Sequence, residues 1–312
     1  MSLKMLIKED GWDTLSSELL TLATHDRGLR YVPNAGNAGD ALIACGTWQL
    51  FDDLGLSPVP SRATMLTAGD VAIYAGGGNL VNEYQDCASF LERCLAVGVR
   101  RALVLPQTVR GHEGLLQRLD DRFTIACRES ESLERARASG TRAQLIFAPD
   151  LALRIDVNRL LTQCQRLPVR AQLMKDLALN GRLPAYLAWR SRLLRLAMEH
   201  RSTLHIIRND VEAVAGVNGD ARWDVSGLYW SEFTLRSEVD FVTRDLLMLM
   251  KSAREVVTNR LHAGVAAALV GRRVTYTDNS YGKIRAVYNS SLKDIDGISF
   301  AGSGQQETVR AA

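Results

Sequence analysis

The sequence predicts an α/β protein with two doubly wound parallel sheets, each in a Rossmann-like domain. Three observations support this prediction. Short apolar segments alternate with helical segments, polar or glycine residues follow nearly every apolar segment, and the alternation resumes after a less regular stretch over 156–201. Such alternation is typical of parallel sheets, and the 312 residues are enough for two domains of about 100–200 residues each.

The first domain, predicted over 1–155, repeats one strand–helix pattern. In the helix expected over 40–54, Ile43, Leu50 and Phe51 lie on one mostly apolar face. Sheets of this kind bind ligands outside the carboxyl ends of their strands. The predicted strands are 29–32, 71–74, 102–105, 123–127 and 145–148, and the predicted helices lie near 40–54, 82–97, 112–119 and 130–139.

A helical connecting segment is predicted over 156–201, followed by a second domain over 202–312. Residues 186–201 form a predicted helix whose basic and apolar faces overlap. The overlap favours an inter-domain helix over a membrane-docking one. The second domain is expected to face the first across a ligand cleft. Its predicted strands are 203–207, 255–257 and 273–276, with helices over 237–254, over 264–269 and after 283.

Charge and cysteine usage exclude several classes of protein. A net charge of +3 and a pI near 8.6 do not reach the pI above about 9 that is usual for nucleic-acid-binding domains. The five cysteines form no C-x-x-C pair, so we expect reduced thiols rather than disulfides or a zinc site. No signal-peptide pattern and no apolar stretch of about 18–20 residues is visible. We therefore expect a cytoplasmic protein with at most peripheral membrane contact.

Glycines and polar side chains gather where the strands of the first domain are predicted to end. The runs 36–40 and 76–79 are rich in glycine, which permits close backbone approach to a ligand. Asn37, Asn79 and Gln107 offer neutral hydrogen-bonding groups nearby. Taken singly, these residues also fit ordinary turn chemistry. Arg128 and Asp150 follow two further strands, so five successive strand ends carry side chains that can hold a polar ligand.

The turn over 258–263 predicts an anion-binding site. Asn259, Arg260 and His262 stand where a strand gives way to a helix. The first N–H groups of a helix lack partners, and the helix dipole favours phosphate or carboxylate there. A purely structural helix start would need only an Asn259 cap, and a lone His262 could be structural, but Arg260 beside it favours a functional role. Arg208 follows another predicted strand in the same way.

The order and spacing of these motifs resemble the polysaccharide pyruvyl transferase family over about residues 30–292. No single motif is specific, whereas their succession is. One departure is that the strand before the Arg-Leu-His turn often ends in Ser in this family and here ends in Thr258-Asn259, which a helix cap should tolerate. The matching motifs are NAGDALI at 37–43, GGGNL at 76–80, LPQT at 105–108, RES at 128–130, PD at 149–150, RNDVE at 208–212, NRLHA at 259–263 and DNSYGK at 278–283.

This resemblance implies two facing Rossmann-like domains, as in glycosyltransferase-B enzymes. It also implies transfer of pyruvate from phosphoenolpyruvate onto two hydroxyls of a sugar, as a cyclic ketal, with release of phosphate. No cofactor or metal is expected. The acceptor would be a sugar of a polysaccharide or of its lipid-linked precursor. We assign the donor to Arg208, Asn259, Arg260, Leu261 and His262, and the acceptor to Asn37, Gly77, Gly78, Asn79, Gln107, Arg128 and Asp150.

The residue types suit this chemistry independently of the resemblance. Arginine forks and a helix start bind the phosphate and carboxylate of phosphoenolpyruvate. Asp40, which matches an acid in the family's Gly-Asp motif, can act as the base, and Asp150 or Glu83 are the alternatives. His262 or Arg260 can stabilise the departing phosphate, and His262 can also protonate the donor carbon. We assign catalysis to Asp40, Arg260 and His262. Asp40 also fits a purely structural role as an acid favoured by the helix dipole.

Two alternatives to a pyruvyl transferase stay open at this point. A nucleotide-sugar glycosyltransferase of the same architecture would hold a diphosphate at the helix start. A non-catalytic glycan-binding protein would keep the same fold with a degenerate site. A fold shared by many chemistries does not choose among them.

Overall fold

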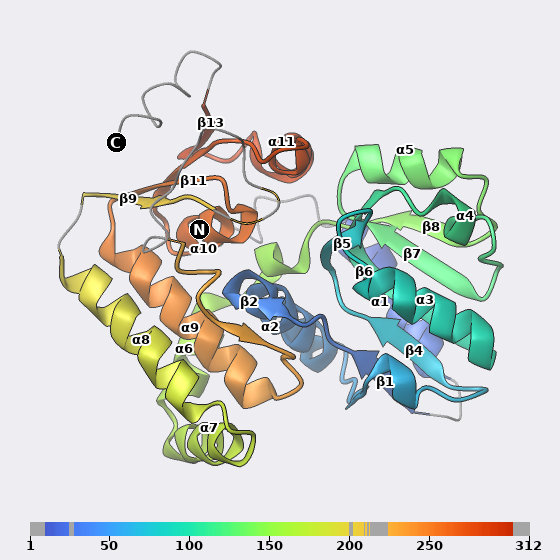
Figure 1. The fold of residues 1–312 in the computed structure, drawn as a ribbon, viewed down its shortest axis with the longest axis horizontal. Coiled ribbons are helices and arrows are strands. Elements are labelled where there is room, and N and C mark those ends of the chain that lie inside the picture. The colour runs from blue at the N-terminus through green and yellow to red at the C-terminus, as the bar shows by residue number, and fades with distance from the viewer. Residues whose placement is uncertain are drawn as a thin grey trace. The chain divides into compact units, whose positions relative to one another are not determined.

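The structure is a computed structural model that describes residues 10–24, 28–199, 202–208, 210, 212 and 224–301. These residues divide into two compact units. The N-terminal unit contains the described residues up to 34 together with 46–154, and the C-terminal unit contains 35–45 and the described residues from 155 onward. Residues 35–45, predicted to lie in the first domain, belong to the C-terminal unit in the structure. Figure 1 labels the elements of both units.

A parallel sheet in the order β3-β1-β4-β6-β7-β8 forms the frame of the N-terminal unit, with β5 paired to β6. The chain passes from β1 to its neighbour β3 and then returns to β4 on the other side of β1. This reversal makes the sheet doubly wound, and the switch point between β1 and β4 is where such sheets bind ligands. The strands are β1 (Leu29–Val32), β3 (Val59–Pro60), β4 (Val71–Tyr74), β5 (Gly77–Val81), β6 (Arg101–Arg110), β7 (Phe123–Cys127) and β8 (Gln144–Phe147).

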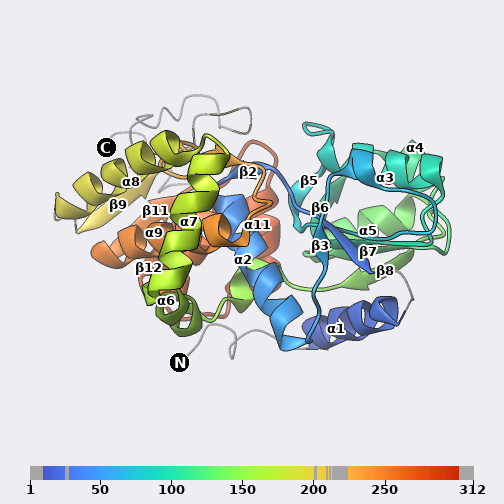
Figure 2. The ribbon, with the colours of Figure 1, turned by 90° about the horizontal axis from the view of Figure 1, so that it is seen from below.

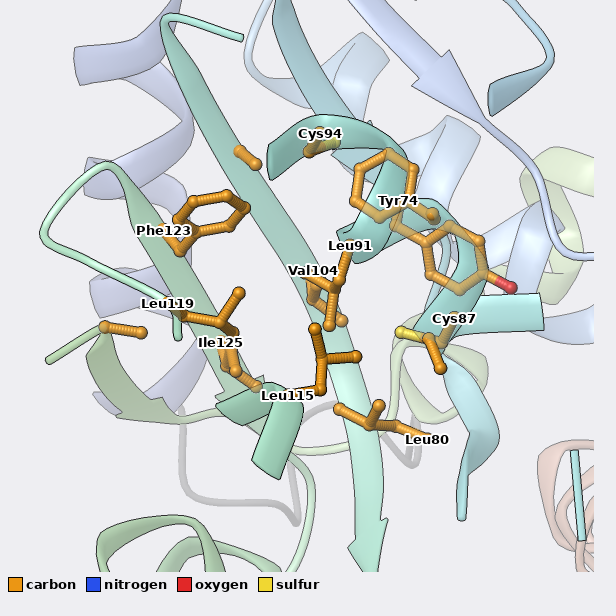
Figure 3. Close-up of a cluster of buried hydrophobic side chains, with 14 of the residues drawn as sticks. Tyr74, Leu80, Cys87, Leu91, Cys94, Val104, Leu115, Leu119, Phe123 and Ile125 are labelled. Atoms are coloured by element: carbon orange, nitrogen blue, oxygen red, sulfur yellow. The ribbon is translucent and has the colours of Figure 1, made fainter. Parts of the chain in front are cut away.

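Helices bury both faces of this sheet, which explains why its central strands are apolar throughout. On one face Tyr31 packs edge-on against Trp48 and Phe51 of α2. The next residue, Val32, points to the other face and joins the core that Figure 3 shows around Tyr74. The helices are α1 (Asp10–Ala23), α2 (Ala38–Asp53), which starts in the C-terminal unit, α3 (Asp86–Val97), α4 (Glu113–Leu116) and α5 (Ser130–Ala138), with short turns at Ala63–Met65 and Leu151–Arg154.

The C-terminal unit is built on a second parallel sheet, in the order β13-β12-β11-β9. Because neighbouring parallel strands end at one edge, the residues after β9, β11 and β12 are brought together. A short antiparallel pair of β2 (Gly36–Asn37) and β10 (Trp230–Ser231) ties the start of α2 to this unit. The other elements are β9 (Thr203–Ile206), α9 (Arg236–Ser252), β11 (Glu255–Thr258), α10 (Leu261–Leu269), β12 (Arg273–Tyr276), α11 (Lys283–Val287), a π-helical turn (Tyr288–Leu292) and β13 (Ile298–Phe300).

The segment predicted as a connecting region contains three helices that belong to the C-terminal unit. They are α6 (Val157–Gln165), α7 (Leu167–Leu179) and α8 (Leu183–Met198), and each packs against α9. Tyr186 and Trp189 of α8 stack with Tyr229 in an aromatic cluster. Figure 2 shows the same helices from below. Among the described residues, none of the helices is long and apolar enough to cross a bilayer.

Two parts of the first sheet differ from the prediction. The glycine-rich run after β4 was expected to be a loop, but Gly77–Val81 forms β5. β4 and β5 pair with successive stretches of the long strand β6, so β5 continues the same edge after a bend. Glycine is needed at that bend because Gly77 has φ 146°. The expected helix over 82–97 consequently begins only at Asp86.

Candidate functional site

The carboxyl ends of β9 and β11 bring Arg208 and Arg260 together in the C-terminal unit. The Asn259 side chain accepts a hydrogen bond of 2.7 Å from the Arg208 backbone N–H. The Thr258 hydroxyl accepts one of 2.9 Å from the Arg260 N–H and donates to the carbonyl of Ile206 at 2.6 Å. These bonds fix the turn between the two strand ends. Thr258 and Asn259 thus hold the turn in place through their side chains.

Helix α10 begins without a side-chain cap. The expected cap was Asn259, but Arg260 occupies the N-cap position and makes no capping hydrogen bond. Asn259 is instead committed to Arg208. The first turn of α10, which carries His262, therefore receives no acceptor from its N-cap side chain, and a helix end of this kind favours an anion.

Acidic side chains pair with both arginines. Arg208 donates to Asp210 at 2.8 and 3.0 Å and also to Glu212. Arg260 donates to Asp224 at 2.9 and 2.5 Å and contacts Asp210 at 2.8 Å. The arginines were predicted, but Asp224 as a partner was not. Asp210 and Glu212 stand at two and four positions after Arg208, which is the signal in the sequence for this pairing.

Lys283 and Asn279 extend this group of charges from the end of β12. Lys283 contacts both carboxylate oxygens of Glu212, at 2.9 and 2.8 Å, and Asn279 donates to Glu212 at 3.1 Å. Three cations thus meet three carboxylates at adjoining strand ends. We call Arg208, Asp210, Glu212, Asp224, Arg260 and Lys283 the charged cluster.

The pKa of Asp210 is lowered by this arrangement. Burial by itself would raise the pKa, but the hydrogen bond from Arg208 and the charges of Arg260 and Arg208 outweigh burial and bring it to about 2. Asp210 keeps about a third of its side chain exposed, at 34%. It is therefore an ionised carboxylate that bridges both arginines and is within reach of solvent.

Asp40 lies beside His262 in the same unit. A Cβ atom on Gly39 would lie 3.0 Å from the Cβ of His262, so glycine lets the start of α2 approach α10 closely. The Asp40 carboxylate accepts a hydrogen bond of 2.8 Å from the Asn37 N–H, and a Cβ on Gly36 would overlap it at 2.0 Å. The glycines of this motif thus make room for the carboxylate and for His262.

Burial raises the pKa of Asp40 above its ordinary range. The nearby His262, the hydrogen bond from Asn37, and the charges of Lys283 and Arg260 oppose this rise and do not cancel it. Asp40 is half-buried. A half-buried carboxylate with a raised pKa, next to a histidine and an arginine, has the properties expected of a general base.

The residues predicted for the acceptor divide between the two units. Asn37 lies in the C-terminal unit, where its side chain accepts a hydrogen bond of 2.7 Å from the Gly39 N–H. Opposite Asn37 on the β2–β10 ladder stands Trp230, which is 65% exposed. Sequence reasoning did not single out this tryptophan, because no periodicity or motif marks a two-residue strand.

Two of the other acceptor residues meet at the switch point of the N-terminal sheet. Asn79 donates to Asn34 at 2.6 Å and to the Tyr74 hydroxyl at 2.9 Å. Gln107 accepts from the Asn79 N–H at 3.1 Å and donates to the carbonyl of Ala75 at 2.9 Å. Gln107 is completely buried. The side-chain amide oxygen of Asn79 is also buried and has no hydrogen-bond partner among the described residues.

Arg128 and Asp150 form a buried ion pair in the same unit. Arg128 donates to Asp150 at 2.7 Å and to the Thr108 hydroxyl at 3.0 Å, and both charged side chains are 1% exposed. Asp150 also accepts from the Ala152 N–H at 2.9 Å. Their neighbours within the unit therefore already use the polar groups of both residues. Gly77 and Gly78 lie on β5 beside this region.

The five cysteines are the remaining side chains that could be reactive or bind a metal ion. All five cysteines are free and buried, as predicted. Burial raises the pKa of the Cys94 thiol to about 12, so it stays protonated and inert. Within the described part of the chain, no group of three His, Cys, Asp or Glu side chains has a geometry suited to a metal ion.

Comparison with known proteins gives the family. The sequence profile of the polysaccharide pyruvyl transferases matches residues 37–281. General stress protein 30 of Bacillus subtilis is 23% identical over 268 residues, which cover 77% of this chain and 66% of that protein. The chain thus spans slightly less than two thirds of that relative's length. A crystal structure of an uncharacterised Klebsiella pneumoniae protein superposes with a TM-score of 0.72 at 21% identity, covering 94% of this chain and 99% of the other, and shows the same fold. Because the profile spans most of the sequence and includes both the Asp40 and the Arg260–His262 motifs, the chain belongs to the polysaccharide pyruvyl transferase family.

Proposed function

We propose that this protein transfers pyruvate from phosphoenolpyruvate to two hydroxyls of a sugar, forming a cyclic ketal and releasing phosphate. Family membership supports a pyruvyl transfer role in polysaccharide biosynthesis. The observation that carries the finer proposal is the meeting of Asp40, Arg260 and His262 in one unit. A base, a guanidinium and an imidazole at an uncapped helix start suit an anionic donor whose carbon must gain a proton.

The donor would bind by exchange with the carboxylates of the charged cluster. Asp210 and Glu212 hold the nitrogens of Arg208, while Asp210 and Asp224 hold those of Arg260. Phosphoenolpyruvate carries both a phosphate and a carboxylate, which can accept the same forked hydrogen bonds. Asp210 is the partner most open to displacement, because a third of its side chain is exposed.

The proposed reaction forms two C–O bonds and breaks one. His262 donates a proton to C3 of phosphoenolpyruvate, and the resulting cationic C2 is attacked by the first sugar hydroxyl, whose proton Asp40 accepts. The C2–O bond to phosphate then breaks, and the second hydroxyl closes the ketal. The proton of the first hydroxyl passes from Asp40 to His262, where it replaces the proton that now stands in the new methyl group, and the proton of the second hydroxyl leaves with phosphate. Arg260 stabilises the charge on the departing group.

Asp40 fits the role of base better than the other carboxylates considered. Asp150 is buried in an ion pair with Arg128, and a ligand that displaced it would leave a buried charge without its partner. Glu83 lies in the N-terminal unit beside Arg110, at 3.5 Å, on a partly exposed surface. Asp40 alone of the three stands next to the residues assigned to the donor.

The identity of the acceptor is the least specific part of the proposal. Family membership implies a sugar or polysaccharide acceptor. We propose that it engages Asn37, whose β-ladder neighbour Trp230 exposes an aromatic ring of the kind that packs on sugars. The same proposal includes two domains that face each other as in glycosyltransferase-B enzymes, a lipid-linked acceptor and a cytoplasmic location. It also assigns acceptor binding to residues of the N-terminal unit, namely Gly77, Gly78, Asn79, Gln107, Arg128 and Asp150.

The reaction can be tested directly. The purified protein is incubated with phosphoenolpyruvate and a panel of sugar acceptors, and in parallel with nucleotide sugars and the same panel. We expect phosphate release that depends on the acceptor, together with a product that carries an acid-labile pyruvate ketal by mass spectrometry and NMR. Nucleotide release would identify a glycosyltransferase. Glycan binding without release of either would identify a binding protein, and both outcomes contradict the proposal.

A further inference from the structure

We propose that the face formed by α8 and α9 of the C-terminal unit docks on an anionic lipid bilayer. The two helices pack side by side, and a groove of about 360 Å³ runs between them. It is lined by the apolar side chains of Leu193, Leu194 and Met248 and by the charged side chains of Arg190, Arg244 and Lys251. This inference is independent of the reaction proposed above.

Apolar side chains on this face are exposed in a regular row. Leu187, Leu194 and Met198 are 45%, 55% and 73% exposed, and their spacing of seven and four residues places them on one stripe of α8. Met248 of α9, 42% exposed, stands across the groove. Several large apolar side chains exposed on one side of a helix are unusual on a surface that faces only water and indicate an interaction site.

Positive charge is concentrated in the same segment. Helices α8 and α9 together contain six Lys or Arg and three Asp or Glu, a net charge of +3. Helix α8 itself holds Arg190, Arg192 and Arg195 and no acidic residue. The overlap of basic and apolar residues seen in the sequence places exposed Leu and Met side chains among arginines on α8, a combination that suits lipid surfaces with anionic headgroups.

One acidic residue lies in the groove, and its charge is compensated. Asp245 contacts Arg244 at 2.5 Å and Arg190 at 3.4 Å, and it accepts a hydrogen bond from Tyr186. Lys251 and Arg195 are exposed on the same two helices. The face therefore keeps a net positive charge around its apolar row.

Charge also decides which partner fits. A second copy of this chain, related by a two-fold axis, would place this positive segment against itself and would be repelled. An acidic protein would satisfy the charge but would need its own groove for the protruding row. A bilayer with anionic lipids satisfies both features at once, because headgroup phosphates meet the Arg and Lys side chains while Leu187, Leu194 and Met198 enter the acyl boundary.

The test is co-sedimentation of the full chain with vesicles, without substrate. Vesicles of phosphatidylcholine alone are compared with vesicles of equal parts phosphatidylcholine and phosphatidylglycerol. We expect binding to the anionic vesicles only, and a loss of binding at about 0.5 M NaCl, where charges are screened within a few ångströms. The double variants Leu194→Glu with Met198→Glu, and Arg195→Glu with Lys251→Glu, should each bind at least about tenfold more weakly.

Matched controls separate this face from the rest of the surface. Met65→Glu changes a side chain that is 69% exposed in the N-terminal unit, and Arg142→Glu changes an exposed arginine there. Both should bind like the wild type, and circular dichroism checks that every variant is folded. The proposal is overturned if wild type does not bind anionic vesicles or if the groove variants bind as well as the controls. It is also overturned if light scattering detects a dimer that Leu194→Glu dissociates while vesicle binding stays unchanged.

Discussion

The two units of this protein each gather polar residues at strand ends, but they use them in opposite ways. In the N-terminal unit Gln107, Arg128 and Asp150 are at most 1% exposed, and backbone or side-chain neighbours hold them. In the C-terminal unit Asp40 and His262 are half-buried, and Asp210 is a third exposed. The first arrangement resembles a structural network, whereas the second leaves charged groups where a ligand can reach them.

The difference shows that polar residues at strand ends do not by themselves mark a binding surface. Buried polar groups must find partners, and a ligand can bind such groups only by displacing those partners. Asn79 is the exception in the N-terminal unit, because its buried side-chain amide oxygen has no hydrogen-bond partner among the described residues. A functional contribution from that unit is therefore best sought at Asn79 and at the switch point around it.

The largest expected effect concerns Asp40 in the C-terminal unit. Asp40→Asn removes the proposed base and should lower turnover by about 10²–10⁴-fold, with donor affinity nearly unchanged. Since burial raises the pKa of Asp40, folding disfavours its ionised form, and the neutral Asn should leave the melting temperature equal or higher. Steady-state kinetics and calorimetry check both. Near-normal turnover in Asp40→Asn would show that Asp40 is not the base and is instead an acid favoured at the helix start by the helix dipole.

The next contrast concerns the fully buried arginine. Arg128→Ala leaves Asp150 as an uncompensated buried charge and should lower the free energy of unfolding by about 3–5 kcal/mol. Arg118→Ala is the matched control, because its pair with Glu92 is exposed and should be worth about 0–1 kcal/mol. Chemical denaturation measures both. If the two variants lose equal stability, the N-terminal cluster is not the structural network described here.

A smaller effect is expected on donor binding. Arg260→Ala should weaken phosphoenolpyruvate binding by about 1.5–3 kcal/mol, the scale of a charge-assisted hydrogen bond. Arg260→Lys keeps the charge but loses the fork, so we expect it to recover only part of the affinity. Calorimetric titration of folded variants gives the values. Unchanged affinity in Arg260→Ala would exclude this donor site while leaving the contrast in burial intact.

The smallest expected effect concerns Asp210, the carboxylate that phosphoenolpyruvate would displace from Arg208 and Arg260. The pKa of Asp210 is lowered to about 2 in the folded protein, so its contribution to stability is present above the ordinary value of about 4 and is lost as the pH falls toward 2. Asp210→Asn should remove this acid dependence. It should also tighten phosphoenolpyruvate binding about threefold, since one competing charge is gone. Weaker donor binding in Asp210→Asn would contradict exchange.

Local patterns in the sequence predicted most of the strands and the helices between them. β1, β4, β7 and β12 begin and end at the predicted residues, because apolar runs bounded by polar residues determine buried parallel strands. β5 was not predicted, since its pairing with β6 comes from the bend at Gly77 rather than from its own glycine-rich sequence. The two-residue strands β2 and β10 exist only through each other, and no local pattern can reveal them.

The candidate site was predicted by residue type more than by location. The anion-suited residues Arg208, Arg260 and His262 lie in one unit, as expected for a single donor site. Asp40 joins them because of a long-range association that periodicity does not encode. The ion pairs of Arg260 with Asp210 and Asp224 depend on side-chain geometry in the folded chain and were not predicted from the sequence.

The path of the chain through α2 has a consequence for synthesis on the ribosome. Asp40 and His262 lie 222 positions apart in the sequence, yet they belong to one compact unit. A nascent chain can complete the N-terminal sheet early, but residues 35–45 must wait for β11 and α10 before they find their place. Folding of the C-terminal unit is therefore a late event of high contact order. Asp40 and His262 would come together only when almost the whole chain has emerged, so a truncated product would fold in part and lack the proposed catalytic group.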